Sequence, residues 1–209
     1  MELAATLSFL GAAILLTLMP GPDNIFVLTE SLTKGQRNGF AISVGLCSGV
    51  LVHTLAAATG VSIIIQKSAL AFSVVKYLGA AYLFYMAYQA YNEKRLEIEV
   101  KRKPVEHETS FLKLARKGFL MNVLNPKVAL FFMALLPQFV VTDGFSVTVQ
   151  MIILGIIFML QGLVIFGLIS LLSGKLSKYL NSARFWKITK YGKVSVLALL
   201  GLGLAMARK

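Results

Sequence analysis

The sequence predicts an all-α integral membrane protein with six transmembrane helices. Hydrophobic residues make up 57% of the 209 residues and charged residues only 14%, and the mean hydropathy is +0.76, which is far more apolar than a soluble domain of this size. Apolar stretches of about 20 residues, the length that crosses a bilayer core, fall at 3–28, 40–65, 70–91, 118–137, 148–172 and 188–207. The chain left between them is too short for a soluble catalytic domain.

The basic residues predict the orientation of these segments. The net charge is +12, and six crossings place 16 Lys and Arg residues in the loops on one face and three on the other. Cytoplasmic loops carry such an excess of Lys and Arg, so loop 92–117 is expected to be cytoplasmic and both termini to lie outside. Because the positive charge follows the membrane loops, it indicates a lipid bilayer as the partner and no nucleic acid.

Prolines interrupt the first and fourth apolar segments. Pro20 and Pro22 lie in the first, "LMPGPDN", while Pro126 and Pro137 lie in the fourth. Proline removes a backbone donor and breaks a helix, so helices 1 and 4 are predicted to be discontinuous. Aligning the first break with the second pairs Pro22 with Pro126, half a chain apart.

A single transporter domain, 1–209, is therefore predicted to consist of two inverted three-helix repeats, 1–91 and 118–209, joined by the basic loop 92–117. Three helices are an odd number, so the second repeat must insert in the opposite orientation. Paired broken helices in such repeats mark a binding site near the bilayer midplane.

The helix breaks supply groups that suit a zwitterionic substrate. A half-helix N-terminus offers free N–H groups to an anion, and the free carbonyls of the preceding half suit an ammonium. A charge at the bilayer centre costs about 2.5 to 3.5 kcal/mol, so Asp23 and Lys127 are expected to face the protein interior, a cavity or each other. The candidate substrate-binding residues are Pro20, Gly21, Pro22, Asp23, Asn24, Asn122, Asn125, Pro126 and Lys127.

Several of these polar residues also have a purely structural interpretation. Asp23 can cap the half-helix that follows Pro22, and Asn122 and Asn125 can satisfy backbone groups freed by Pro126. Asp23 and His53 are the candidates for proton coupling, although a histidine in an apolar helix can equally be a hydrogen-bonded packing residue. Gln161 can reach the same cavity or bond across helices. These alternatives stay open at the level of the sequence.

The remaining features indicate packing. Gly45 and Gly49 form a Gly-x-x-x-Gly motif, which permits close helix approach either inside one protomer or in a homodimer. Phe, Tyr and Met occur in every apolar segment and are interpreted as lipid-facing surface and packing. Cys47 is the single cysteine, so an intramolecular disulfide is excluded.

Two other functional classes compete with a transporter of small organic molecules. A metal-cation exporter of related fold needs clustered His, Cys or carboxylate ligands, and Cys47 with His53 is a small set. A membrane-embedded enzyme needs a nucleophile and base, an acidic pair or a metal, and the apolar segments hold one Asp, one His and one Cys. No enzymatic activity, metal site or cofactor is expected.

Two long motifs resemble the LysE/RhtB family of bacterial amino-acid exporters. They are "PGPDNIFVLTESLTKGQRNGFAISVGLCSGVLVH" (20–53) and "FLMNVLNPKVALFFMALLPQFV" (119–140). The resemblance implies a multi-pass protein of the bacterial inner membrane that exports amino acids or close derivatives, by proton antiport, without an enzymatic step. It also assigns the first family motif to Pro20–Asp23 and the second to Asn122, Asn125, Pro126 and Lys127. Homoserine, threonine, homoserine lactone, leucine and lysine are all substrates within this family, and the residues do not select among them.

Overall fold

The computed structural model describes residues 2–19, 21–61, 68–93, 110–141, 144–180 and 182–206, and within these ranges the regular structure is entirely helical. Four of the described helices are long and apolar enough to cross a membrane. They are α3 (Gln36–Ala56), continued by the π-helical turn η1 (Ala57–Val61), α5 (Ala69–Asn92), α8 (Val147–Leu171) and α10 (Ala183–Met206). This confirms the prediction of an all-α protein with several apolar helices.

The first and fourth apolar segments each form a bent pair of helices. α1 (Leu3–Leu18) and α2 (Pro22–Lys34) meet at 58°, and α6 (Phe111–Val123) meets the segment that begins with α7 (Pro126–Leu130) at 51°. The second segment continues through a π-helical turn, η2 (Phe131–Leu135), and a 3-10 turn, η3 (Leu136–Phe139). If each bent pair is one span, the described residues hold six candidate spans. Both predicted helix breaks are present.

The observed helices differ in extent from the predicted segments, because the half-helices beside the breaks are partly polar. α2 continues past residue 28 to Lys34 and buries Glu30 and Ser31, polar residues at which a search for apolar stretches stops. α6 starts at Phe111, inside the predicted loop 92–117. The rest of that loop, 94–109, lies outside the described residues. Pro137 does not break the segment further, because it occupies the first turn of η3, where no N–H is needed.

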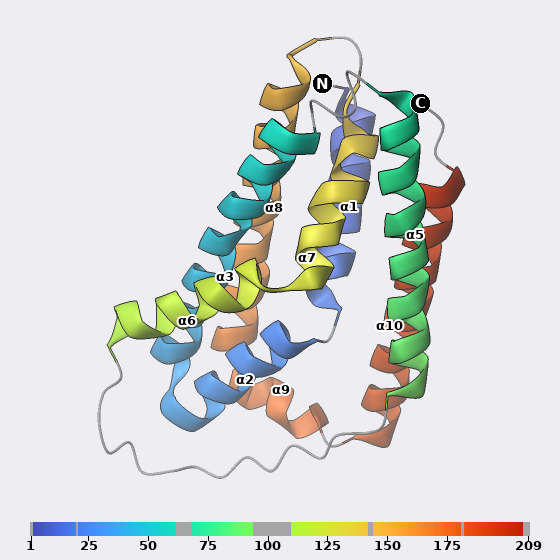
Figure 1. Ribbon diagram of the computed structural model, residues 1–209. Helices are drawn as coiled ribbons and strands as arrows, with labels where there is room; N and C mark the ends of the chain where they lie inside the picture. The colour runs from blue at the N-terminus through green and yellow to red at the C-terminus, as the bar shows by residue number, and fades with distance from the viewer. Residues whose placement is uncertain are drawn as a thin grey trace.

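The long helices α3, α5, α8 and α10 run back and forth along one long axis, and α6 lies across it (Figure 1). The start of α1 and the end of α10 lie at the same end of the molecule, drawn at the top, whereas α2 and the short α9 (Ser173–Leu180) lie at the other end. α5 and α10 pack side by side as a pair, and α3 packs mainly on α6 and α8. The space between these two groups is where the large cavity described below lies.

The Gly-x-x-x-Gly motif is used for packing within the protomer. A Cβ atom on Gly45 would lie 1.9 Å from the Ala115 carbonyl oxygen, and one on Gly49 would lie 2.8 Å from Cβ of Asn122. From the other side, a Cβ on Gly118 would lie 2.3 Å from the Ile42 carbonyl oxygen. α3 and α6 therefore touch backbone to backbone, as small residues at an interface allow, and this contact holds Asn122 against α3.

Candidate functional site: two broken helices beside a cavity

The first break leaves carbonyl groups of α1 without their helical donors. Leu16 O would accept from residue 20 in a continuous helix, but residue 20 is a proline and has no N–H; Pro20 itself lies outside the described residues. The ammonium of Lys127 donates to Leu16 O instead, at 3.2 Å. The chain resumes at Pro22, the first residue of α2, preceded by the N-cap Gly21. A cation was expected at the free carbonyls of the first break. In the structure this cation is the ammonium of Lys127, which lies at the second break.

The second break is built in the same way, with Pro126 at the first position of α7. Asn125 caps this helix, since its side-chain oxygen accepts from the Lys127 N–H at 3.0 Å. Asn122 O, which would otherwise point at residue 126, accepts from the Asn125 N–H at 2.9 Å and lies 3.1 Å from Nε2 of His53. The structural interpretation therefore applies to Asn125, and His53 helps to satisfy a carbonyl freed by Pro126.

Asp23 is joined to the second break and does not cap its own helix. α2 has no side-chain cap, and the buried Asp23 carboxylate accepts from Nδ2 of Asn125 at 2.7 Å. Lys127 supplies a nearby positive charge. Two contacts therefore link the breaks across more than 100 residues of sequence, Lys127 to Leu16 and Asn125 to Asp23.

The other polar residues around the first break extend this network. Nδ2 of Asn24 reaches back to Thr17 O at 2.9 Å, which ties the start of α2 to the end of α1. The Thr17 hydroxyl accepts from Nε2 of Gln161 at 2.9 Å, so Gln161 bonds across helices, as one of its two interpretations expected. Buried oxygens of Asn24, Asn122 and Gln161 have no hydrogen-bond partner. Such groups are costly to bury, so the interior beside the breaks is polar.

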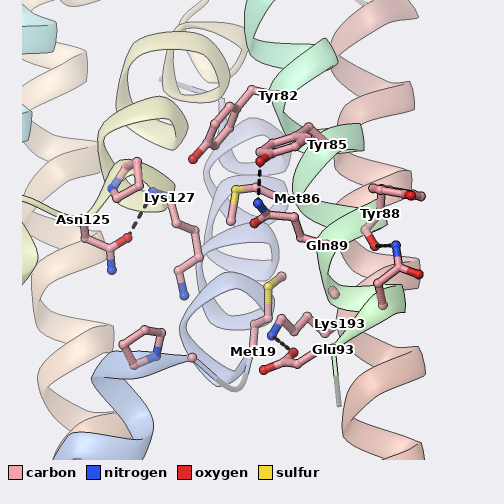
Figure 2. A pocket seen from close by; sticks show the side chains of 15 residues that line it. Met19, Tyr82, Tyr85, Met86, Tyr88, Gln89, Glu93, Asn125, Lys127 and Lys193 are labelled. Carbon is pink, nitrogen blue, oxygen red and sulfur yellow. Dashed lines mark hydrogen bonds and ion pairs between the residues drawn. The ribbon is translucent and has the colours of Figure 1, made fainter.

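A cavity of about 710 Å³ opens beside the two breaks (Figure 2). Its wall includes Gly21 and Pro22 from the first break and Asn125, Pro126 and Lys127 from the second. The far wall comes from α5 and α10 and comprises Tyr82, Tyr85, Met86, Tyr88, Gln89, Ala90, Asn92, Glu93 and Lys193. Figure 2 shows the Lys127 side chain directed into this space. The volume lies in the range of small-molecule sites.

A second, much smaller cavity of about 20 Å³ lies behind the first. It is lined by Thr17, Asp23, Asn122 and Lys127 together with apolar side chains. Lys127 lines both cavities, whereas Asp23 lines only the small one. Of the predicted binding residues, Gly21, Pro22, Asn125, Pro126 and Lys127 thus face the large cavity, and Asp23, Asn24 and Asn122 support them from behind.

The wall formed by α5 was not predicted from the sequence. Its tyrosines and methionine were interpreted as lipid-facing or packing residues, whereas Tyr82, Tyr85, Met86 and Tyr88 line the large cavity. The sequence contained a signal, because the polar Gln89 follows Tyr85 by one helical turn on an apolar helix. In the structure the two side chains are hydrogen-bonded at 2.6 Å. Paired polar groups one turn apart on an apolar helix indicate a face that avoids lipid.

Comparison with known proteins decides the family. The family model described as "LysE type translocator" matches residues 14–208, nearly the whole chain. The chain belongs to the LysE family of translocators. It is therefore a multi-pass membrane protein of a transporter family, as the motifs predicted.

Relatives of this translocator align over nearly their full length. An uncharacterized membrane protein of Bacillus subtilis, YrhP, is 29% identical and aligns over 95% of this chain and 96% of its own. An uncharacterized membrane protein of Vibrio cholerae is also 29% identical, over 99% and 98%. The homoserine/homoserine lactone efflux protein of Salmonella typhimurium is 27% identical, over 96% of both chains. No solved structure matched the translocator.

His53 offers a test of its two interpretations. Replacement by glutamine keeps an amide donor for Asn122 O, so we expect His53→Gln to retain both transport and its response to the proton gradient. His53→Leu removes the donor and should destabilise the translocator by about 1 to 3 kcal/mol, measured by thermal unfolding in detergent. If His53→Gln is abundant in the membrane but no longer responds to the proton gradient, His53 belongs to the proton path.

Proposed function

We propose that this translocator is a secondary active exporter of amino acids or close derivatives, driven by proton antiport. The observation that carries the proposal is the large cavity between the two broken helices, with the Lys127 ammonium on its wall. The homoserine/homoserine lactone efflux proteins among its relatives support an amino-acid derivative as the substrate. In this proposal the two bent helix pairs are the equivalent first helices of two inverted three-helix repeats, 1–91 and 118–209.

The cavity offers a partner to each end of a zwitterion. The substrate carboxylate binds the Lys127 ammonium, which then exchanges its bond to the uncharged Leu16 O for an ion pair with the carboxylate. The substrate ammonium lies toward the carbonyls at the end of α1. Gly21 lies between these two positions, because a Cβ atom on it would be 3.8 Å from both Lys127 Nζ and Met19 O.

Asp23 is proposed to couple transport to protons. Antiport requires that substrate and proton exclude each other. An ionised Asp23 attracts the substrate ammonium electrostatically, and a proton on Asp23 removes that charge, so each ligand disfavours the other. Asp23 lines the small cavity next to Lys127, which places it close enough to sense the site without lining the large cavity.

An efflux assay tests this function. Cells that lack related exporters but produce this chain are loaded with dipeptides, and the amino acids that appear outside are measured with and without an uncoupler. We expect at least one amino acid to be released faster than from cells with an empty vector, and the uncoupler to abolish the difference. Efflux that survives the uncoupler but stops on ATP depletion would overturn proton antiport.

The proposed orientation places the end of α5, where Glu93 lines the cavity, toward the cytoplasm. The ends of α2 and α5 and the starts of α3 and α10 lie at one end of the molecule (Figure 1), with Lys34, Arg37 and Lys187 among their basic residues. A reporter that is active only outside the cytoplasm should therefore be active when fused at Lys209 and silent when inserted in 92–109. The reverse pattern would contradict the orientation.

Gly21 gives a prediction that tests where the zwitterionic substrate binds. Its backbone is extended (φ −160°), so a side chain is tolerated there, but valine would fill the space between Lys127 Nζ and Met19 O. Gly21→Val should reduce efflux roughly tenfold, the value of one hydrogen bond to a charged group, at unchanged abundance. Gly11→Val is the matched control, since a Cβ on Gly11 meets nothing within 4 Å. Equal efflux from both variants would exclude substrate binding beside Gly21.

A further inference from the structure

One part of the far wall, around Tyr82 and Met86, is largely apolar. Tyr82 and Met86 are one helical turn apart on α5 and are both half-buried, and Tyr85 lies between them in sequence. Figure 2 shows these side chains across the cavity from Lys127. The Tyr85 hydroxyl already accepts from Gln89, so this part of the wall offers mainly aromatic and thioether surface. Such a surface suits an apolar side chain.

The charges on the cavity wall disfavour a second cation. The lining residues include two lysines, Lys127 and Lys193, and one carboxylate, Glu93. Glu93 is already occupied, because Lys193 Nζ lies 2.5 Å from its carboxylate. Lys190 Nζ donates to the Glu93 backbone oxygen at 3.1 Å and adds another positive charge nearby. Asp23 does not line this cavity.

We propose that this cavity selects amino acids whose side chains are uncharged and largely apolar, and that the Lys193–Glu93 ion pair on its wall excludes basic amino acids. The inference rests on the proposed function. Lys127 holds the carboxylate of the substrate, its side chain packs on Tyr82 and Met86, and the positive charge of Lys193 repels the extra ammonium of lysine. Specificity here comes from repulsion as well as from contact.

Proteoliposomes of the purified protein separate this inference from the proposed function. Vesicles are loaded with equal amounts of labelled leucine, alanine and lysine, and the release of each is followed after a pH gradient is imposed. We expect leucine to leave at least about tenfold faster than lysine, as one uncompensated charge contact would produce. Lysine release as fast as leucine release would overturn the inference and leave amino-acid export intact, whereas release of no amino acid would contradict the proposed function itself.

Substitution of each partner of the ion pair gives opposite expectations. Lys193→Gln frees the Glu93 carboxylate toward the cavity and should raise the lysine-to-leucine ratio about tenfold. Glu93→Gln breaks the same ion pair but keeps the Lys193 ammonium, so the lysine-to-leucine release ratio should stay at the wild-type value or fall. The double variant removes both charges and should return to near the wild-type ratio. If Lys193→Gln and Glu93→Gln change the ratio in the same direction, the pair is structural and the inference is wrong.

The apolar wall is tested with two uncharged substrates. Met86→Ala removes side-chain surface that leucine contacts and alanine does not, so it should lower leucine release about fivefold relative to alanine release, the value of roughly one buried methylene. Met206→Ala, at an exposed methionine of α10, is the matched control. An unchanged leucine-to-alanine ratio in Met86→Ala would show that α5 does not contact the substrate side chain.

Discussion

Lys127→Gln and Asp23→Asn should each reduce export by roughly ten- to a hundredfold while the protein still reaches the membrane. A hydrogen bond to a charged group is worth about 1.5 to 3 kcal/mol, and Lys127 provides the charge for the substrate carboxylate in the proposed site. Removing either residue also leaves the other charge without its neighbour in the interior. The measurement is the efflux rate divided by the amount of protein in the membrane.

Controls distinguish a functional loss from a folding defect. Lys187→Gln removes a lysine that is exposed at the start of α10 and should export normally. Because Asp23 and Lys127 interact, the Asp23→Asn, Lys127→Gln double variant should lose less than the sum of the two single losses, expressed as free energies. Normal export by Asp23→Asn at wild-type abundance, or failure only through degradation, would show that Asp23 has a structural role and would contradict the central-site proposal.

The second large effect is expected at Asn125, which joins the two breaks. Asn125→Asp keeps an oxygen to cap α7 but places a second carboxylate where the Asn125 amide now donates to Asp23 at 2.7 Å. Like charges at this separation repel strongly, so export should fall by about a hundredfold, as 3 kcal/mol would produce. The measurement is again efflux per amount of membrane protein.

Exchanging the two residues sharpens this prediction. The double variant Asp23→Asn, Asn125→Asp restores one amide and one carboxylate in contact, with the same total charge. If the bond between the breaks is what matters, export should recover to within about tenfold of wild type, since only the position of the charge differs. If the exchange stays as inactive as Asn125→Asp alone, Asp23 acts through its own position, as a proton carrier must.

The features that the sequence could predict are those encoded within one segment. Apolar length indicated membrane helices, because transfer into a bilayer depends on the composition of each segment by itself. Pro22 and Pro126 located both breaks because a proline has no N–H and clashes with the helical turn that precedes it, so the helix before it cannot continue unchanged. Asp23 and Lys127 were predicted to face the interior because a lipid-exposed charge is too costly.

Contacts between segments were decided only by the tertiary structure. That Asn125 bonds Asp23 and Lys127 bonds Leu16 depends on how the two breaks pack, and many donors in the sequence could satisfy a freed carbonyl equally well. The partner of Gly45 and Gly49 was undecided for the same reason, since any close helix satisfies the motif. Tyr82 and Met86 illustrate this limit. An aromatic or thioether side chain has a similar energy whether it faces lipid or lines a cavity, so the sequence does not distinguish the two positions. Only the position of α5 beside the breaks places these residues at the site.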